Sequence, residues 1–164
     1  MVLNGILQNL TLKFDIFNME IKKLSESDIA DFHKLLEIFT EVFEVEQPVP
    51  HKNHLAAILS NKYFNAFVVR INEKVVGGLT LYRLENYFDE KSIGYIYDVA
   101  ITPEFQQRGL GKKLISEVCS YCRNNNFKEI FVQAEGTDYS AVGFYKKTGV
   151  SEEIKANHFV YKFK

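Results

Sequence analysis

Residues 96–112 read IYDVAITPEFQQRGLGK, and the organisation of the chain follows from this stretch. It begins with β-branched and aromatic residues, which are typical of a strand. Pro103 ends that strand because proline has no N–H to donate to a sheet ladder. From Leu110 onward, apolar residues recur at helical spacing. The segment therefore predicts a strand, a turn over residues 103–109 and a helix.

The turn has the composition of an anion site. Gly109 and Gly111 let the backbone bend and approach a ligand closely. The free N–H groups of a first helical turn, together with the helix dipole, favour an anion, and Arg108 and Lys112 add positive charge. A pyrophosphate suits this geometry. A bare glycine turn is the alternative, since the dinucleotide and P-loop fingerprints both fail: position 114 is Leu and position 113 is Lys.

Around this segment, strands and helices alternate in an order that predicts a mixed sheet. Strands are expected over 21–24, 66–71, 75–84, 92–102, 127–134 and 158–163, with a short extra strand near 152–155 as an option. Helices are expected over 29–43, 54–60, 110–123 and 139–147, the first preceded by a capping box of Ser25 and Asp28. Hairpins come first and a β-α-β run follows. We expect an α+β (mixed α/β) fold, with a mostly antiparallel sheet and helices on both faces.

Composition narrows the class of protein. The 164 residues are 46% apolar and 25% charged, which is typical of one globular domain. A net charge of -1 argues against a nucleic-acid partner, and the sequence has no apolar run of the roughly 18 residues that span a membrane. No secretory pattern opens the chain, so a cytoplasmic location is expected. Residues 1–18 read as an extension, or as an extra surface strand, and residues 19–164 as the domain.

Two cysteines, Cys119 and Cys122, lie in the predicted helix over 110–123. No second Cys/His pair completes a zinc site, so we expect thiols without chemistry and no metal.

Two motifs resemble those of the GNAT superfamily of acetyl-CoA-dependent N-acetyltransferases. Gln106, Gly109 and Gly111 match Q/R-x-x-G-x-G/A, and residues 141–149 match A-x-x-x-Y-x-K-x-G. The resemblance covers about residues 19–164 and looks strongest toward type I aminoglycoside (gentamicin) 3-N-acetyltransferases. The similar blocks are 75–79, 93–100, 130–135, 138–149 and 158–159. Asp138 departs from the Asn commoner in the superfamily, a departure that this branch shares.

The resemblance implies where acetyl-CoA binds. The pantetheine arm would pair with residues 99–101 between strands 93–102 and 127–134, which splay apart in this fold. The pyrophosphate would lie on the backbone of residues 107–112. An N–H near Val99 or Ala100 could stabilise the oxyanion. The implied cofactor-binding residues are Val99, Ala100, Ile101, Gln106, Gln107, Arg108, Gly109, Leu110, Gly111, Lys112 and Tyr145.

The resemblance also implies direct acetyl transfer to a primary amine. Tyr145 would protonate the leaving thiolate, although a core aromatic is the alternative. Asp98 or Glu135 would take the amine proton, while a structural salt bridge remains the other interpretation of Asp98. Asp138 either contributes to the acceptor site or caps the helix that follows it.

The expected acceptor is a small cationic amine, such as an aminoglycoside acetylated at its 3-amino group. Acidic loops recur where the acceptor would bind, and the expected substrate-binding residues are Asp98, Glu135, Asp138, Tyr97 and Glu85. Tyr82 and Tyr95 could cover sugar rings or simply pack. Acetylation of another amine, or a non-catalytic acyl-CoA-binding module, are the competing functions. A homodimer is expected through the last strand.

Overall fold

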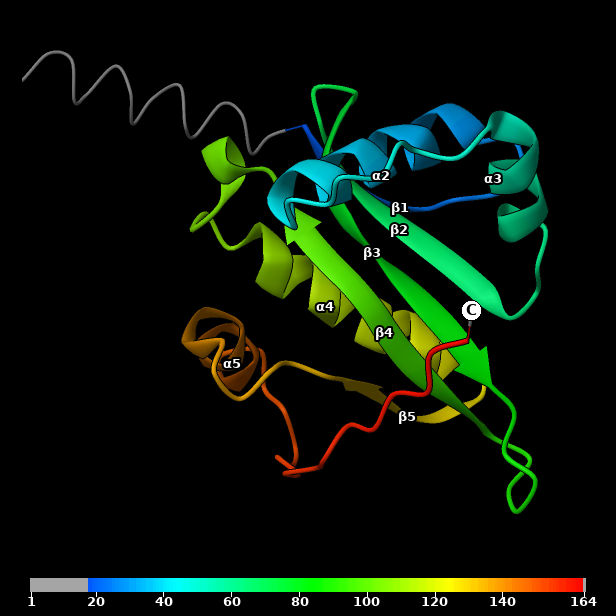
Figure 1. Ribbon diagram of the computed structural model, residues 1–164, viewed down its shortest axis with the longest axis vertical. Helices are drawn as coiled ribbons and strands as arrows, with labels where there is room; N and C mark the ends of the chain where they lie inside the picture. The colour runs from blue at the N-terminus through cyan, green and yellow to red at the C-terminus, as the bar shows by residue number, and fades with distance from the viewer. Residues whose placement is uncertain (1–17, 164) are drawn as a thin grey trace, which may run out of the picture. The chain divides into compact units, whose positions relative to one another are not determined.

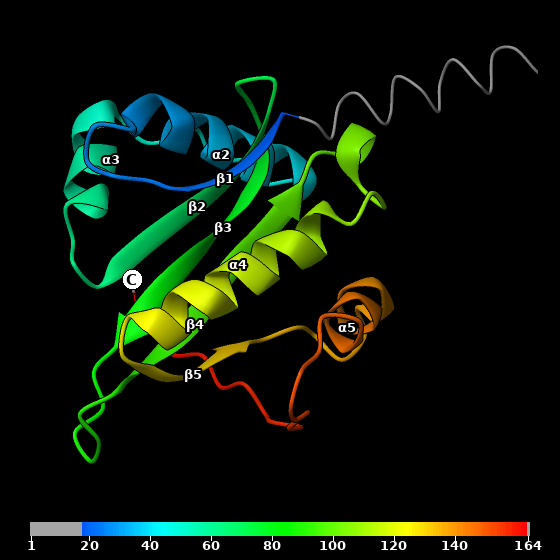
Figure 2. The same cartoon turned by 180° about the vertical axis from the view of Figure 1, so that it is seen from behind.

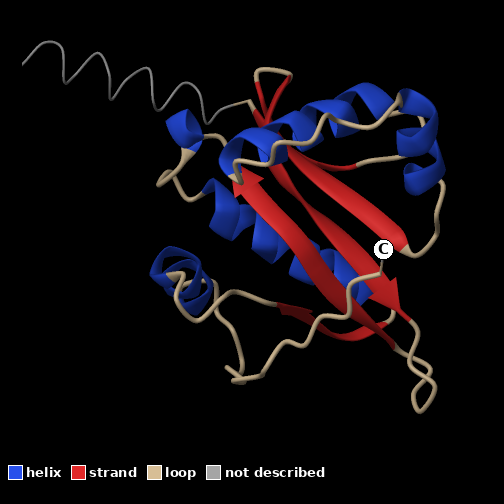
Figure 3. Cartoon of the chain, viewed as in Figure 1, coloured by secondary structure: helices blue, strands red, loops and turns tan. Residues whose placement is uncertain are grey.

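A five-stranded sheet, in the order β1-β2-β3-β4-β5, organises residues 18–133 of the computed structural model (Figure 1). The strands are β1 (Met19–Lys23), β2 (Phe64–Ile71), β3 (Lys74–Leu84), β4 (Ser92–Ile101) and β5 (Phe127–Val132). Three neighbouring pairs are antiparallel, and β5 joins β4 in parallel (Figure 3). This mixed, mostly antiparallel sheet confirms the expected fold class.

The structure describes residues 18–163. They group into two compact units, residues 18–133 and 134–163, and each is described by itself. The expected extension over residues 1–18 lies almost wholly outside the described residues, and the domain boundary at residue 19 stays a prediction.

A tight turn sets the register between β2 and β3. Asn72 and Glu73 both have positive φ, 49° and 65°, and Ile71 pairs with Lys74. Two central residues with positive φ match the right-handed twist of a hairpin, and asparagine tolerates that conformation well. The hairpin predicted from Asn72-Glu73-Lys74 is thereby confirmed.

Helices cover both faces of the sheet, as the sequence predicts. On one face lie α2 (Ile29–Val42) and α3 (Lys52–Leu59), and on the other lies α4 (Leu110–Asn124) (Figures 1 and 2). The apolar stripe of α2 is buried against β2 and β4, where the smallest partners are Ala66 and Ala100. Gly78 lets this helix approach, because a Cβ there would collide with the Phe67 carbonyl oxygen and lie 2.8 Å from Leu35 Cδ1.

The second unit contains α5 (Tyr139–Lys146), and no strand is present among residues 147–163. The predicted strand over 158–163, and the optional one over 152–155, are therefore wrong. Phe159, Tyr161 and Phe163 alternate as in a strand but are almost fully exposed. Alternation marks which side chains could face a core, whereas a strand also needs a neighbour with which to share a ladder.

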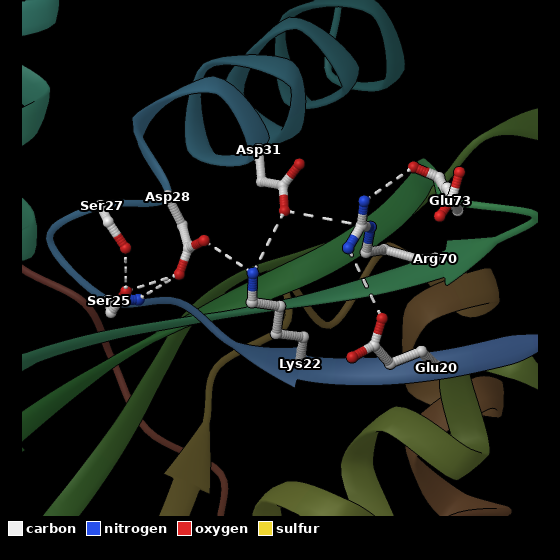
Figure 4. A network of polar contacts seen from close by, with 8 residues as sticks. All are labelled: Glu20, Lys22, Ser25, Ser27, Asp28, Asp31, Arg70 and Glu73. Atoms are coloured by element: carbon white, nitrogen blue, oxygen red, sulfur yellow. Dashed lines mark hydrogen bonds and ion pairs between the residues drawn. The ribbon is translucent and has the colours of Figure 1, made fainter.

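A polar network ties the start of α2 to the sheet (Figure 4). The Asp28 carboxylate accepts hydrogen bonds from Lys22 Nζ (2.6 Å) and from the Ser25 backbone N–H (2.8 Å). The predicted capping box is wrong, because Asp28 and not Ser25 is the N-cap of α2 and no side chain caps this helix. The hydrogen bonds to its carboxylate hold the pKa of Asp28 at about 2, the Lys22 hydrogen bond being the main cause. Asp31 lies 3.8 Å from Lys22 Nζ and extends the network toward Arg70.

We predict that Asp28→Asn destabilises the fold at pH 7 and flattens its response to acid. The pKa of Asp28 is lower in the folded chain than its usual 3.8, so its stabilisation is present above pH 4 and is lost as pH falls toward 2. The linkage amounts to about 2 kcal/mol.

Urea unfolding at pH 7, 4 and 2.5 measures this effect. The difference between the wild-type and Asp28→Asn unfolding free energies should be full at pH 7 and fall to about a third of that value at pH 2.5. A gap of equal size at all three pH values would contradict the assignment. Lys34→Met, which breaks an exposed ion pair with Glu37, serves as a control with little expected effect.

Candidate active site

One edge of β4 becomes free halfway along the strand. The β4–β5 ladder runs from Ser92↔Phe127 to Ile96↔Val132, where β5 ends, while β4 continues to Ile101 (Figure 3). Among residues 18–133, β4 residues 97–101 therefore pair with β3 alone. An unpaired strand edge presents N–H and C=O groups to any extended ligand.

A β-bulge lies at the start of this free edge. Leu79 pairs with Val99 and Leu81 pairs with Ile96, so Tyr97 and Asp98 together oppose Thr80. Side chains along a strand alternate between faces, and a bulge resets that alternation by one residue. Tyr97 and Asp98 consequently lie on the same face of the sheet as Thr80, the face covered by α2. Without the bulge, Asp98 would share the α4 face with Ile96.

The backbone of β4 presents alternate N–H groups to the free edge. Asp98 N–H donates to Thr80 Oγ1 (3.3 Å) and Thr102 N–H donates to the Val76 carbonyl (2.9 Å), both on the β3 side. Successive N–H groups of a strand point to opposite edges. The N–H groups of Val99 and Ile101 therefore face the edge that β5 leaves free.

The Asp98 carboxylate is half-buried, and burial raises its pKa above the usual 3.8. No cationic side chain of residues 18–133 lies within ion-pair distance of it, which removes the alternative of a salt bridge inside this unit. A partly desolvated carboxylate with no neighbouring cation can accept a proton or bind an ammonium group.

Aromatic rings surround the bulge on the same face. Tyr95 stacks on Phe131 at 4.8 Å between ring centroids, and Tyr97 meets Tyr82 and Tyr95 edge to face at 5.7 Å. Tyr97 is 59% exposed. Burial raises the pKa of the Tyr82 and Tyr95 phenols, and the Tyr97 phenol and Asp98 carboxylate raise it further. The rings thus form a wall whose polar edges lie beside the carboxylate.

Tyr95 also makes a side-chain contact at the end of the β4–β5 ladder. Its hydroxyl donates to Gln133 Oε1 at 3.0 Å, one residue beyond the end of β5. This bond and the stacked Phe131 ring hold the two strands together at the point from which β4 continues alone.

The predicted anion turn has the backbone geometry that such a site needs. After a short 3-10 helix, η1 (Pro103–Phe105), Gln107 has φ 57° and Gly109 has φ 80° at the N-cap of α4. Both residues have a left-handed backbone conformation, and this conformation turns consecutive N–H groups toward one side. No side chain caps α4, so the first-turn N–H groups are available to an anion. A Cβ at Gly109 would meet nothing within 4 Å, so the approach is open.

Two side chains of this turn, those of Gln106 and Arg108, contact neighbouring parts of the protein. Gln106 Nε2 donates to the Ile101 carbonyl at 2.9 Å, which fastens the turn to the end of β4. The Arg108 guanidinium lies over the Phe105 ring, 5.0 Å from its centroid. Lys112 is exposed on α4. At the predicted anion site, the backbone N–H groups are therefore better placed than these side chains to meet a ligand.

Glu85 lies apart from Asp98. Its carboxylate accepts a hydrogen bond from Ser92 Oγ (3.0 Å) and lies 3.5 Å from Arg83 Nε. Ser92 starts β4, six residues before Asp98, a separation of about 20 Å along a strand. The structure does not bring these two predicted substrate-binding residues together.

The second unit holds the other three predicted residues. Asp138 is the N-cap of α5 and accepts from the Ala141 N–H at 2.9 Å, so its predicted capping role is confirmed. Glu135 is exposed and lies three residues beyond β5, in the turn that leads to Asp138, and not on the strand. Tyr145 is half-buried on α5, with its ring edge to face against Phe144 at 5.0 Å. Its role as general acid stays a prediction.

The two cysteines are unpaired, with Cys122 buried and Cys119 half-buried in α4. Burial raises the pKa of both thiols, that of Cys122 to about 12. Within residues 18–163, no three His, Cys, Asp or Glu side chains gather to hold a metal. None of the described helices has the length and apolarity needed to cross a bilayer.

Thr80, Phe131 and Gln133 were not predicted from the sequence. Each contributes through strand register: Thr80 by opposing the bulge, and the other two by lying beside Tyr95. Period-2 patterning places Phe131 on a strand face, but only the parallel pairing shows which β4 residue it meets.

Comparison with known proteins agrees with this geometry. Residues 32–150 match the acetyltransferase (GNAT) family. An aminoglycoside acetyltransferase, meta-AAC0020, from an uncultured soil metagenomic sample, solved in complex with sisomicin, is 38% identical, with a TM-score of 0.88 over 90% of this chain and 97% of that one. A second soil aminoglycoside acetyltransferase, HMB0005, is 28% identical, with a TM-score of 0.79 over 88% and 99%.

Among curated proteins, an uncharacterised N-acetyltransferase of Archaeoglobus fulgidus is 25% identical over 134 residues, or 77% of this chain and 89% of its own length. Because the family match spans well over half of the chain, this protein belongs to the acetyltransferase (GNAT) family.

Proposed function

We propose that the protein transfers an acetyl group from acetyl-CoA to a primary amine of an aminoglycoside, with the 3-amino group as the expected position. The observation that carries this proposal is the Asp98 carboxylate, which has no cation within ion-pair distance among residues 18–133 and lies beside exposed tyrosines at the free edge of β4. The likeness to meta-AAC0020, solved with sisomicin, supports the acceptor class.

The cofactor half of the site rests on backbone groups. The left-handed turn at Gln107 and Gly109 and the uncapped start of α4 suit the pyrophosphate of coenzyme A. The free edge of β4 suits the amide-bearing pantetheine arm, which would pair with residues 99–101. Acetyl-CoA supplies a thioester whose carbonyl carbon an amine can attack.

The chain would supply two proton transfers and one hydrogen bond. The Asp98 carboxylate, directly or through water, accepts the proton that the amine loses as its nitrogen bonds the carbonyl carbon. The Val99 N–H, which faces the free edge, stabilises charge on the thioester oxygen. As the carbon–sulfur bond breaks, the Tyr145 phenol donates its proton to sulfur, a role taken from the family resemblance. The products are an acetamide and the CoA thiol.

The acceptor half of the site suits a ring-bearing polycation. The Tyr97 and Tyr82 rings offer apolar faces against which a sugar ring can pack, and their electron-rich faces attract ammonium groups. The Asp98 carboxylate adds the negative charge that a cationic amine needs. Glu135 lies in the second unit and remains the other proposed base.

An acceptor panel tests the function. Purified protein with acetyl-CoA is offered sisomicin, gentamicin, spermidine or a peptide with a free N-terminus, and products are followed by mass spectrometry. We expect an acetylated aminoglycoside, whose modified amine NMR then identifies. Turnover with only spermidine or the peptide would sink the acceptor assignment. Calorimetric binding of acetyl-CoA with no turnover of any amine would instead indicate a binding module.

For Asp98→Asn, we predict a loss of turnover of about 100-fold, the scale of general base catalysis. The base acts only when ionised, and burial raises its pKa. Wild-type activity should therefore rise with pH through a value above the usual 3.8, and this acid limb should vanish in the variant. Steady-state rates from pH 5 to 9 measure both effects. Glu117→Gln, on the exposed side of α4, controls for loss of one negative charge. An unchanged profile in Asp98→Asn would transfer the role of base to Glu135.

For Tyr145→Phe, we predict turnover at least 10-fold lower, with acetyl-CoA affinity within 2-fold of wild type, because only the proton donor is removed. Single-turnover rates and calorimetry measure the two quantities. Tyr139→Phe is a matched control, since this tyrosine lies on the same helix and is 83% exposed. Equal losses in both variants would point to damage to α5, and no loss in Tyr145→Phe would exclude the phenol as the acid.

A further inference from the structure

We propose that Thr80 is a positioning residue: its hydroxyl holds the Asp98 N–H and thereby fixes the β4 bulge that presents both the Asp98 carboxylate and the Val99 N–H to the active site. This inference rests on the proposed function for its catalytic consequence. Its structural content, a side-chain acceptor for the Asp98 N–H, rests on the hydrogen bond itself.

The bulge brings two residues of β4 to one residue of β3. Tyr97 and Asp98 both oppose Thr80, so the regular ladder is disrupted at this point. An unsatisfied N–H in a half-buried strand costs about 1–3 kcal/mol. Thr80 is 5% exposed, and its Oγ1 accepts the Asp98 N–H at 3.3 Å. A valine of the same shape would fill the space and remove this acceptor.

This hydrogen bond determines where two functional groups point. Because the Asp98 N–H is directed toward β3, the following N–H, that of Val99, is directed to the free edge. Because the bulge resets the alternation of side chains, Asp98 leaves the α4 face and lies beside Tyr97. If the bulge slipped out, the carboxylate would turn toward the apolar side chains of α4, an unfavourable place for a charge.

Backbone exchange tests the hydrogen bond independently of catalysis. NMR-detected hydrogen exchange of the Asp98 amide is compared in wild type, Thr80→Val and Thr80→Ser. We expect at least 10-fold faster exchange in Thr80→Val and near-wild-type protection in Thr80→Ser, which keeps the acceptor. Equal protection in Thr80→Val and wild type would overturn the proposal. If Thr80→Val does not fold, Thr80→Ala removes the same acceptor and is judged by the same criteria.

Kinetics with acetyl-CoA and sisomicin test the consequence. We expect kcat to fall at least 10-fold in Thr80→Val, with KM for acetyl-CoA within 2-fold, and Thr80→Ser to restore most of the turnover. Thr40→Val is the matched control: it removes a threonine hydroxyl that donates to the Leu36 carbonyl within α2 and leaves the Thr80 hydroxyl in place. If Thr40→Val and Thr80→Val have matched unfolding midpoints and lose kcat equally, lost stability alone explains the effect. That result would overturn the positioning role.

The pH profile separates positioning from general damage. The titratable groups that face Asp98 from β3 and β4 are the phenols of Tyr82, Tyr95 and Tyr97, and burial raises the pKa of Tyr82 and Tyr95 above the usual 10.0. A loosened bulge hydrates the carboxylate, so the acid limb of kcat should move to lower pH in Thr80→Val and return in Thr80→Ser. An unmoved limb with normal kcat would overturn the proposal. If the wild type acetylates no amine at all, the proposed function fails, while the exchange experiment still decides the role of Thr80.

Discussion

The extra residue that β4 carries opposite Thr80 is the constraint on which the rest of the site depends. A regular antiparallel ladder would place Asp98 among the apolar contacts of α4, where a carboxylate is costly. One inserted residue moves it to the other face, next to the tyrosine wall, and turns the neighbouring amide outward. A local irregularity of the backbone thus produces an arrangement that side-chain identity alone could not produce.

The second requirement is that the pairing of β4 with β5 ends where the candidate site begins. Beyond Ile96↔Val132, β4 pairs with β3 alone among residues 18–133, and the chain then turns through Gln107 and Gly109 into α4. The backbone N–H groups at the free edge of β4 and those at the start of α4 therefore lie on one continuous segment, residues 99–112. An extended ligand that ends in phosphates suits both kinds of donor at once, and this juxtaposition is what the proposal of coenzyme A uses.

Much of this could be predicted from the sequence because it is local. The strand before Pro103, the glycine turn and the apolar stripe of α4 all depend on neighbouring residues, and they are found within one or two positions of the prediction. The hairpin at Asn72 is equally local. The sequence is compatible with two roles for Asp138, and the hydrogen bond from the Ala141 N–H shows that its side chain caps α5.

What the sequence did not reveal depends on register. The bulge, the position of Phe131 against Tyr95 and the involvement of Thr80 all require knowing which residues of different strands face each other. The acidic loop residue Glu85 was grouped with Asp98 by charge alone, whereas strand length separates them. The alternating segment over residues 158–163 shows the same difficulty, because a pattern suited to a strand does not specify a neighbour.

The two thiols of α4 have a practical consequence for work on this enzyme. Thiol-reactive dyes respond to thiolate, and burial suppresses ionisation of Cys119 and Cys122 in the folded chain. A colorimetric reagent added to a reaction mixture should therefore report newly formed coenzyme thiol with a small protein background, and a rising background would itself signal that α4 has begun to open.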